Sequence, residues 1–557
     1  MRAHRLLAGA AAAGLFSAHL IAPPAAMAIA PPVIDPAALP APDTPGPTQE
    51  MRKTRECATP VVVAEPALGQ PAPGNTMFDL KQAWQYSTGA GVTVAMIDTG
   101  VTPNPRFPKL FPGGDFVLGL ENGGLVDCDS HGTVVASIIG AAPFNPADRP
   151  VPRPAGVADA PAPPGVPANP APTTPPPPPP PAKTSTVTVT APAPPPPPPP
   201  PGDQPPPPPG DQPPPPVPPA NGNGADAQPL IPGLAPGEPD GIVGVAPDAT
   251  LISIRQSSMA YSPARGGGEP DDKRKAGDIE TLAKAVRTAA DLGAKVINIS
   301  LASCINAAAP VNQDPLGAAI RYAAVDKDAV IVAAAGNRGD QRVQQQDCGQ
   351  NPYNSLNPDD PRDWAGVRTI VSPAWFSDYV LSVGAVTPDG QPMPDSINGP
   401  WVAVAAPGFR IMGLSSVNGS AINALPKNDE PGMGQGLWGT SFSAAYVSGV
   451  AALVRAKYPE LTAHQVIRRI TETAHNPARG VDNAVGHGVV DAVGALTWDV
   501  PPGQPQPTER INTTLNVPPD PPAPDLTPRW VALAGSAGVL AVIVVAGGAV
   551  AIRRRMQ

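Results

Sequence analysis

The sequence lacks an excess of positive charge. Its 557 residues carry 37 lysines and arginines against 46 aspartates and glutamates, and the formal net charge is −9. The sequence contains no basic face or cluster that could neutralise the phosphates of a nucleic acid. We therefore expect an acidic, soluble surface and no nucleic acid among the partners.

Patterns typical of metal sites are missing as well. The chain has only four cysteines, and no CxxC pair of the kind that holds zinc is present. No loop gathers the acidic side chains that a calcium ion needs. The sequence therefore gives no ground to predict a metal site.

Proline is the residue in excess. With 87 prolines and 55 glycines, much of the chain cannot be ordinary packed core. We expect a proline-rich N-terminal arm over 29–75, a proline-rich loop over 143–237 and a proline-rich linker over 500–529, because such segments favour extended conformations and bury little apolar surface. A folded pattern resumes on both sides of the loop, so the loop is an insertion into one domain, 76–499. A solvated spacer is a simpler interpretation of it than a partner-binding or nicking site.

Both ends of the chain carry targeting patterns. Residues 1–28 combine early arginines, an apolar stretch and small residues, which predicts a signal peptide rather than a membrane anchor. Residues 530–552 are uncharged and about 35 Å long as a helix, enough to cross a bilayer core of about 30 Å, whereas a buried core helix does not fit that length. The basic tail 553–557 then stays in the cytoplasm. These patterns predict a single-pass protein of the cell membrane with its body on the extracytoplasmic (periplasmic) side.

An exported chain with four cysteines favours two disulfides. Cys57, Cys128, Cys304 and Cys348 allow three connectivities, and the sequence does not choose among them. A local Cys304–Cys348 pair would leave Cys57 to bond with Cys128 and would staple the arm to the body. In that case we expect the arm to stay attached even where it is cut.

From residue 80 onward, short apolar runs alternate with helical patterns. This alternation predicts an α/β fold in which helices cover both faces of a mainly parallel sheet. Buried strands are expected at Val92–Ile97, Leu251–Ile254, Val296–Ile299 and Val330–Ala334. Helices are expected at Ile279–Leu292 and Pro315–Lys327, and a capping box at Thr462 and Gln465 predicts the start of a late helix.

Asp98 and His131 are candidates for acid–base chemistry. Asp98 ends an apolar strand before a glycine, so its carboxylate lies at the carboxyl edge of the sheet, where α/β active sites assemble. Many strands end in aspartate, so this signal is weak alone. His131 precedes a helical run, whereas the other histidines beyond the signal peptide follow the candidate nucleophile described next. A lone histidine is usually a polar surface residue, and the order of the motifs is what favours catalysis.

Ser441 is the candidate nucleophile. It follows a glycine and opens a long run of small and apolar residues, which predicts a buried helix with this serine in its first turn. Free backbone N–H groups and the helix dipole stabilise negative charge there. A serine in that place is often only an N-cap. Ser443 is a rival nucleophile, but it lies further from the glycine turn.

The three motifs occur in the order Asp, His, Ser, which differs from the order in chymotrypsin and in the α/β-hydrolases. The runs 98–100, 131–133 and 439–441 are similar to the three signatures of the subtilases, and 334–337 is similar to their oxyanion-hole segment. Over about 80–495, without the insert, the chain thus resembles a subtilisin-like serine protease.

This resemblance implies a subtilisin-like three-layer fold and a serine endopeptidase that works through an acyl-enzyme without a cofactor. It implies a catalytic triad of Asp98, His131 and Ser441, with Asn337 in the oxyanion hole. The family pattern also implies that Ser300, Leu301 and Ala302 bind the substrate.

The sequence departs from the family pattern in two places. Ala445 stands where subtilases usually have a proline, which removes no catalytic atom. Ala302 and Ser303 stand where the substrate-binding strand usually ends in two glycines. Their side chains would narrow the specificity pocket, so we expect a more selective enzyme than the degradative subtilisins.

The architecture resembles the mycosins, the membrane-anchored subtilases of type VII secretion systems. The shared features are the signal peptide, the arm, the paired cysteines, the single C-terminal anchor and the short basic tail. This resemblance implies exported protein or peptide substrates, membrane subunits of a type VII secretion complex as partners, and a second role in stabilising that machine. The alternative is a structural scaffold with dispensable protease activity, and a nutrient-degrading protease is disfavoured by the anchor.

Overall fold

The computed structural model describes residues 29–119, 123–152, 227–264, 271–338, 348–353, 360, 362–427, 430, 432–510 and 527–556. The predicted signal peptide and most of the predicted insert lie outside the described residues. The chain divides into two compact units, one ending at Ile511 and the other beginning at Asn512. Each unit is described by itself below.

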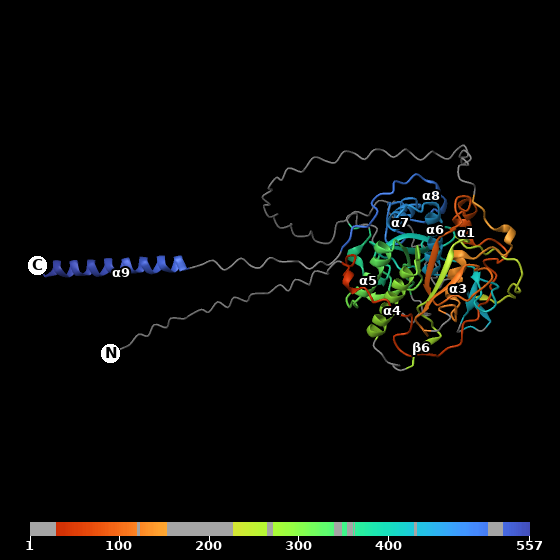
Figure 1. Ribbon diagram of the computed structural model, residues 1–557, viewed down its shortest axis with the longest axis horizontal. Helices are drawn as coiled ribbons and strands as arrows, with labels where there is room; N and C mark the ends of the chain where they lie inside the picture. The colour runs from red at the N-terminus through yellow and green to blue at the C-terminus, as the bar shows by residue number, and fades with distance from the viewer. Residues whose placement is uncertain are drawn as a thin grey trace, which may run out of the picture. The chain divides into compact units, whose positions relative to one another are not determined.

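A parallel sheet forms the centre of the first unit (Figure 1). In the described part of the chain it has seven strands in the order β12-β11-β9-β7-β2-β5-β3. These strands are β2 (Thr93–Asp98), β3 (Leu110–Asp115), β5 (Thr250–Arg255), β7 (Val296–Ile299), β9 (Val330–Ala334), β11 (Val380–Val386) and β12 (Val402–Pro407). Except in the edge strand β3, these strands are runs rich in valine, isoleucine and alanine that are buried almost throughout, as expected for a parallel sheet covered on both faces.

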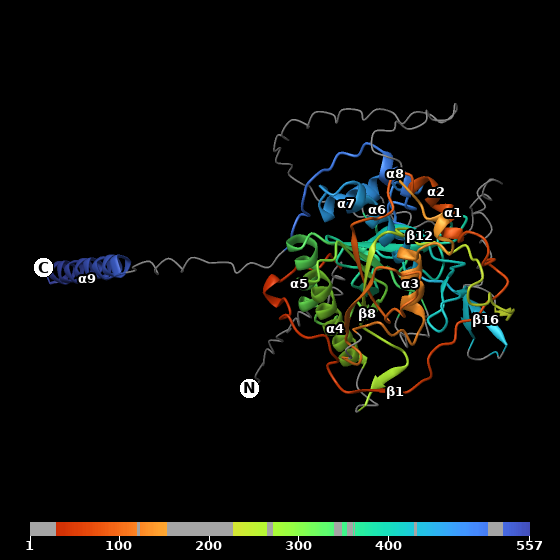
Figure 2. The same ribbon diagram turned by 45° about the vertical axis from the view of Figure 1, so that its right-hand side comes forward.

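Helices cover both faces of this sheet and complete three layers. One face packs against α3 (His131–Gly140) and α6 (Thr440–Lys457), and the other against α4 (Asp271–Asp291) and α5 (Asp314–Arg321). Figures 1 and 2 both place α7 (Ala463–Glu472) and α8 (Ala492–Thr497) beside α6. The predicted α/β fold with helices on both faces is confirmed.

Most predicted elements are present with shifted ends. The four predicted strands correspond to β2, β5, β7 and β9, and the capping box that begins α7 has both of its hydrogen bonds. The helix expected at Ile279–Leu292 begins earlier, at Asp271, and the one expected at Pro315–Lys327 is α5 followed by a π-helical turn, η3 (Tyr322–Asp326). Three strands of the sheet, β3, β11 and β12, were not predicted.

Smaller elements surround the sheet. The short strands are β1 (Met51–Lys53), β4 (Gln228–Pro229), β6 (Tyr261–Pro263), β8 (Ser303–Asn306), β10 (Thr369–Ser372), β13 (Gly413–Leu414), β14 (Ala421–Ile422), β15 (Ala424–Pro426) and β16 (Met433–Gly436). The short helices are η1 (Pro36–Ala38), α1 (Pro73–Met77), α2 (Leu80–Ala83), η2 (Pro146–Asp148) and η5 (Trp364–Gly366). The short strands pair mostly as antiparallel ribbons. The ribbon of β8 and β10 lies next to the site described below.

The N-terminal arm lies against the body. Its strand β1 pairs antiparallel with β6, and its residue Ile34 is 2% exposed in the core that includes α5. A disulfide joins Cys57 in the arm to Cys128, and a second joins Cys304 to Cys348. The arm is therefore attached through packing, backbone pairing and a covalent bond.

The start of the predicted linker also contacts the body. Glu509 forms an ion pair with Arg321 of α5, 2.7 Å from Nε to Oε1, and Arg510 forms one with Asp378. The backbone N–H of Ile34 donates to the carbonyl oxygen of Arg510 at 2.7 Å. The arm and this C-terminal segment thus meet on one side of the body, and contacts with the body continue to Arg510 rather than ending near residue 500.

The second unit contains α9 (Thr527–Arg555). Within Arg529–Arg555, an 18-residue window has a mean hydropathy of 2.2, and the helix is long and apolar enough to cross a membrane. The three arginines Arg553, Arg554 and Arg555 form its last turn. The predicted C-terminal apolar helix is confirmed.

Candidate active site

Asp98 is the last residue of β2 and is fully buried. Its Oδ1 accepts a hydrogen bond from the backbone N–H of Thr99 at 2.7 Å, and the Thr99 hydroxyl oxygen lies 3.2 Å from it. Gly100 follows with a φ of +101°, and a Cβ there would lie 2.1 Å from the carbonyl oxygen of Val126. Only glycine fits this turn, which is why the strand ends in the sequence Asp-Thr-Gly.

His131 is the first residue of α3. Its Nδ1 lies 2.7 Å from Oδ1 of Asp98, and its side chain is 26% exposed. A Cβ on the next residue, Gly132, would lie 2.0 Å from the carbonyl oxygen of Gly100, so this glycine lets the helix approach the Asp98 turn. An imidazole that donates from Nδ1 to a carboxylate keeps Nε2 as its basic atom.

Ser441 lies in the first turn of α6 after Gly439, whose φ is +144°. Its Oγ donates a hydrogen bond to the backbone carbonyl of Ser300 at 2.9 Å. The ring of Phe442, the next residue, lies 5.1 Å from the His131 ring between centroids. The structure thus brings the predicted aspartate, histidine and serine to one edge of the sheet.

The rival serine has a different environment. Ser443 is fully buried, and its Oγ donates to the carbonyl oxygen of Ala406 at 3.0 Å. It holds the helix against the end of β12. Ser441, which is 7% exposed, is the better placed of the two serines for attack on a substrate.

Asn337 follows β9 and faces the first turn of α6. Its Oδ1 accepts hydrogen bonds from the backbone N–H of Thr440 at 2.9 Å and from the Thr440 hydroxyl at 3.1 Å. Because these two donors occupy the amide oxygen, Nδ2 is left as the donor group of the side chain. It lies 3.3 Å from the position that a Cβ on Gly439 would take, next to the serine turn.

Asp127 is a buried residue of the site that the sequence did not single out. Its Oδ1 accepts from the Thr99 hydroxyl at 2.9 Å, and its Oδ2 accepts from the backbone and hydroxyl of Thr133 at 2.8 and 2.7 Å. Burial, with a smaller contribution from the nearby charge of Asp98, raises the pKa of Asp127 to about 6. The carboxyl group joins the Asp98 turn to the start of α3. Its place four residues before His131 is visible in the sequence, but its contact with Thr99 is not.

The residues between Asp127 and His131 are anchored to different parts of the body. Cys128 is bonded to Cys57 and accepts a backbone hydrogen bond from Ala58. Asp129 accepts from the Ser258 hydroxyl and the Met259 backbone N–H, and burial raises its pKa. The Ser130 hydroxyl lies 2.5 Å from that of Ser416. These contacts fix the segment that carries the histidine.

Ser300, Leu301 and Ala302 connect β7 to β8 beside the serine. Ser300 is 4% exposed, whereas Leu301 and Ala302 are partly exposed. Two residues after Ala302, Cys304 forms a disulfide with Cys348. Of the three residues predicted to bind substrate, Ser300 contacts Ser441 directly, and the contact of all three with a substrate stays a prediction.

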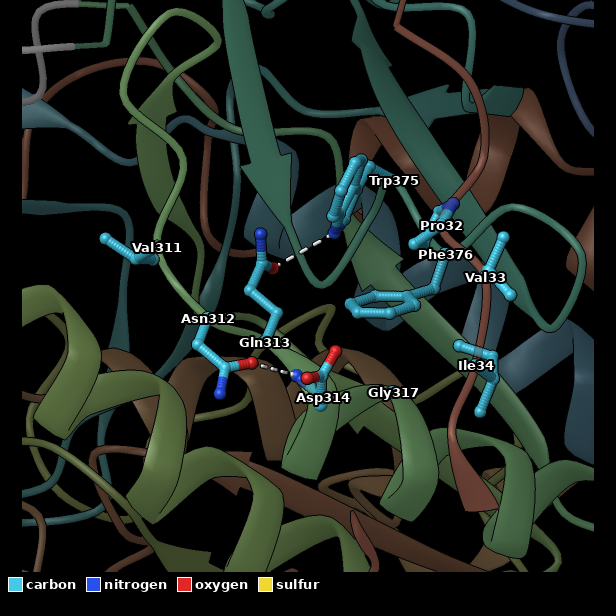
Figure 3. A pocket seen from close by; sticks show the side chains of 10 residues that line it. All are labelled: Pro32, Val33, Ile34, Val311, Asn312, Gln313, Asp314, Gly317, Trp375 and Phe376. Atoms are coloured by element: carbon cyan, nitrogen blue, oxygen red, sulfur yellow. Dashed lines mark hydrogen bonds between the residues drawn. The ribbon is translucent and has the colours of Figure 1, made fainter. Parts of the chain in front are cut away.

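The structure also contains a cavity of about 150 Å³ apart from these residues (Figure 3). It lies where Pro32, Val33 and Ile34 of the arm cross Trp375 and Phe376. None of the predicted site residues lines it. In the part of the chain described above, no group of three or more His, Cys, Asp or Glu side chains is arranged to hold a metal ion.

Comparison with known proteins identifies the family. The model of the subtilase family matches residues 222–488. Mycosin-2 of Mycobacterium tuberculosis is 53% identical over 551 residues, which cover 97% of each chain, and Mycosin-5 of the same organism is 49% identical over 97% of this chain and 94% of its own. The chain belongs to the mycosins, within the subtilase family. It is a serine endopeptidase with the subtilisin-like fold.

Solved mycosin structures have the same architecture. The crystal structure of MycP1 from the ESX-1 type VII secretion system is 39% identical, covers 87% of this chain and all of its own, and has a TM-score of 0.66. A chain in the structure of an intact ESX-5 inner membrane complex is 42% identical, covers 94% of this chain and 99% of its own, and has a TM-score of 0.65. The predicted membership of the mycosins is confirmed.

Proposed function

We propose that this mycosin cleaves exported proteins or peptides through an acyl-enzyme, with Asp98, His131 and Ser441 as its catalytic triad. The observation that carries the proposal is the 2.7 Å contact between Oδ1 of Asp98 and Nδ1 of His131, beside the helix that presents Ser441. Asp98 holds the imidazole in the tautomer whose Nε2 accepts a proton.

The reaction proceeds in two halves. Nε2 of His131 takes the proton of Ser441 Oγ as this oxygen attacks the scissile carbonyl carbon, and the carbonyl oxygen becomes an oxyanion. The C–N bond then breaks, and the leaving amine takes the proton from His131. A water molecule, deprotonated in turn by His131, attacks the ester carbon. The C–O bond to Ser441 then breaks, and His131 returns the proton to Ser441 Oγ, which restores the enzyme.

Asn337 and the helix start are proposed to stabilise the oxyanion. The Nδ2 group of Asn337 remains a donor because its Oδ1 is bonded to Thr440. The backbone N–H of Ser441 lies in the first turn of α6, where N–H groups have no intrahelical acceptor. Two fixed donors beside the nucleophile suit a charge that develops only in the transition state.

We also propose that the enzyme works at the extracytoplasmic (periplasmic) side of the cell membrane within a type VII secretion complex. Support comes from α9, with its terminal arginines, and from the similar chain in the ESX-5 inner membrane complex. Membrane subunits of the complex are the proposed partners, and the body contributes to the stability of the machine. The second candidate function is a scaffold whose protease activity is dispensable. The presence of the similar chain in the ESX-5 inner membrane complex favours it.

The first test is labelling of the full-length chain in detergent with a fluorophosphonate serine probe. We expect labelling of the wild type and of Ser443→Ala, and none of Ser441→Ala. Labelling that persists in Ser441→Ala would refute the assignment of the nucleophile.

Complementation of a strain that lacks the protein separates enzyme from scaffold. If Ser441→Ala restores secretion while the processing of exported substrates stays lost, the protein has both roles. Loss of secretion with an intact, correctly located Ser441→Ala protein would contradict the scaffold role.

A further inference from the structure

A polar side chain lies in the middle of the apolar strand β7. Asn298 stands between Ile297 and Ile299 and is fully buried. A buried amide costs free energy unless its donor and acceptor groups are hydrogen-bonded. The partners of Asn298 therefore indicate what this residue does in the sheet.

The side chain of Asn298 bonds to helix α6 on one side and to the loop after β7 on the other. Its Oδ1 accepts from the hydroxyl of Ser448 at 2.9 Å, and its Nδ2 donates to the hydroxyl of Ser300 at 2.7 Å. Ser448 is fully buried and lies seven residues after Ser441 on α6, hence on the same face of the helix. The hydroxyl donor on Oδ1 fixes which way the amide group is turned.

Ser300 and Ser441 are joined by two reciprocal bonds. The Ser300 hydroxyl donates to the backbone carbonyl of Ser441 at 3.2 Å, and the Ser441 hydroxyl donates to the backbone carbonyl of Ser300 at 2.9 Å. A hydroxyl has one hydrogen to donate. Because Asn298 donates to the Ser300 oxygen, the single hydrogen of Ser300 is directed to Ser441.

We propose that Asn298 is a positioning residue for the nucleophile, acting through Ser300. This inference rests on the proposed role of Ser441. The donors run in one direction, from Ser448 to Asn298, from Asn298 to Ser300 and from Ser300 to the backbone of Ser441. This relay fixes the first turn of α6 relative to the Ser300 loop, and so fixes the position from which Ser441 attacks.

Apolar packing alone would not give this precision. The faces of β7 and α6 pack through small and apolar side chains, which resist separation but tolerate sliding. Hydrogen bonds between buried groups have a defined length and direction. Small misplacements of a reacting group reduce its rate strongly, so the relay matters for the rate of attack more than for folding.

The test is a double-mutant cycle read by the second-order rate of fluorophosphonate labelling of the full-length chain. Asn298→Leu replaces the amide by an apolar side chain of similar size, and Ser300→Ala removes the hydroxyl that it contacts. We expect each variant to label about tenfold more slowly than the wild type. The double variant should be no slower than the slower single variant, because both changes break the same relay.

A matched control separates positioning from stability. Asn423 is also a fully buried asparagine, with three hydrogen bonds to the arm at Val63 and Pro66, away from the nucleophile. Asn423→Leu should lower the melting temperature and leave the labelling rate of the folded protein unchanged. Ser448→Ala and Ser300→Ala form a second double-mutant cycle. If Asn298→Leu does not fold, this second cycle tests the proposal by itself. We expect a loss of about threefold that disappears in the Ser300→Ala background.

Two outcomes would overturn the relay. If Asn298→Leu labels at the wild-type rate, Asn298 has no positioning role. If Asn298→Leu does not fold, a wild-type labelling rate in Ser448→Ala leads to the same conclusion. Effects that multiply in the double variant mean that Asn298 does not act through Ser300. In either case labelling that is still lost in Ser441→Ala leaves the proposed function intact, whereas labelling that persists in Ser441→Ala refutes that function itself.

Discussion

His131 and Ser441 reach the same edge of the sheet on supports of different kinds. His131 follows a short segment, 127–130, held by side-chain contacts, a disulfide to the arm and two carboxyl groups with raised pKa values. Ser441 is the second residue of an 18-residue helix that is buried from Thr440 to Arg455, and the half of this helix that carries Ser441 is tied to the sheet by uncharged groups.

This difference implies different sensitivities. A support made of carboxyl groups and a disulfide responds to pH and to reduction, whereas a support made of buried packing responds to substitutions in the core. We therefore expect the support of the proposed base, rather than that of the proposed nucleophile, to weaken first as pH rises through the raised pKa of Asp127, or under reducing conditions.

The largest loss of activity is expected when the contact between Asp98 and His131 is changed. Asp98→Asn leaves the shape of the buried side chain but allows the wrong tautomer of His131, so kcat should fall about 10⁴-fold, as in other serine proteases. The measurement is peptide-substrate turnover with the melting temperature as a control. A loss below about tenfold in a folded variant would contradict the role of Asp98.

On the nucleophile side, Asn337→Ala should lower kcat by about 10²- to 10³-fold with little change in KM, because one oxyanion donor is removed. Asn351→Ala is the matched control. Asn351 is 2% exposed and bonds to Thr369 and Asn398, so its loss should reduce stability but not kcat of the folded enzyme. Equal kcat losses in the two variants would remove the oxyanion assignment.

On the histidine side, the double substitution Cys57→Ser and Cys128→Ser should lower the unfolding free energy by about 4 kcal/mol, from the 71-residue loop that the bond closes. Removal of the Cys304–Cys348 bond, with its separation of 44 residues, should cost a similar amount. Only the first change should loosen His131 and slow labelling of Ser441 by about tenfold. If loss of the Cys57–Cys128 bond slows labelling no more than loss of the Cys304–Cys348 bond does, the first disulfide does not hold His131 in place.

The same disulfide predicts the fate of the arm. If a protease cuts the arm between Cys57 and the body, non-reducing gels should still show one species, and reduction should release the arm fragment. Release without reduction, or a peptide map with Cys57 paired elsewhere, would contradict the attachment.

The smallest effect is a pH dependence of stability due to Asp127. Its pKa rises from 3.8 to about 6 on folding, so between these values the folded state binds the proton more tightly than the unfolded chain. The unfolding free energy therefore falls as pH rises through this window, by about 3 kcal/mol, and levels off above about pH 6.

Asp127→Asn removes this titration. Melting temperatures of wild type and variant, measured from about pH 4 to about pH 7, should converge or cross as pH rises, because only the wild type loses this contribution. Curves that stay parallel would show that Asp127 does not titrate in this window. Asp240→Asn, at a carboxylate paired with Arg106 away from the site, is the control.

The parts of the fold predicted from sequence are those whose signal is local. Apolar runs marked β2, β5, β7 and β9 because strands of a parallel sheet are buried on both faces. β3 was missed because its run of proline and two glycines is typical of a loop, and it pairs with β5 only with a shift of register. An edge strand tolerates such residues, which a sequence pattern does not reveal.

The same holds for the site. The glycines after Asp98 and His131 are local consequences of tight turns, so these motifs stand out in the sequence. The contact between Asn298 and Ser448 joins residues 150 positions apart, and the ion pair of Glu509 with Arg321 joins residues 188 positions apart. Such pairs depend on the assembled fold, and no spacing in the sequence marks them.

The most direct test of the account is whether the two separately supported residues act as one site. Fluorophosphonate-treated full-length chain is digested and mapped by mass spectrometry, for the wild type and for His131→Ala. We predict a single adduct on the peptide that contains Ser441 in the wild type and its loss in His131→Ala. An adduct elsewhere, or undiminished labelling of Ser441 without His131, would contradict the account.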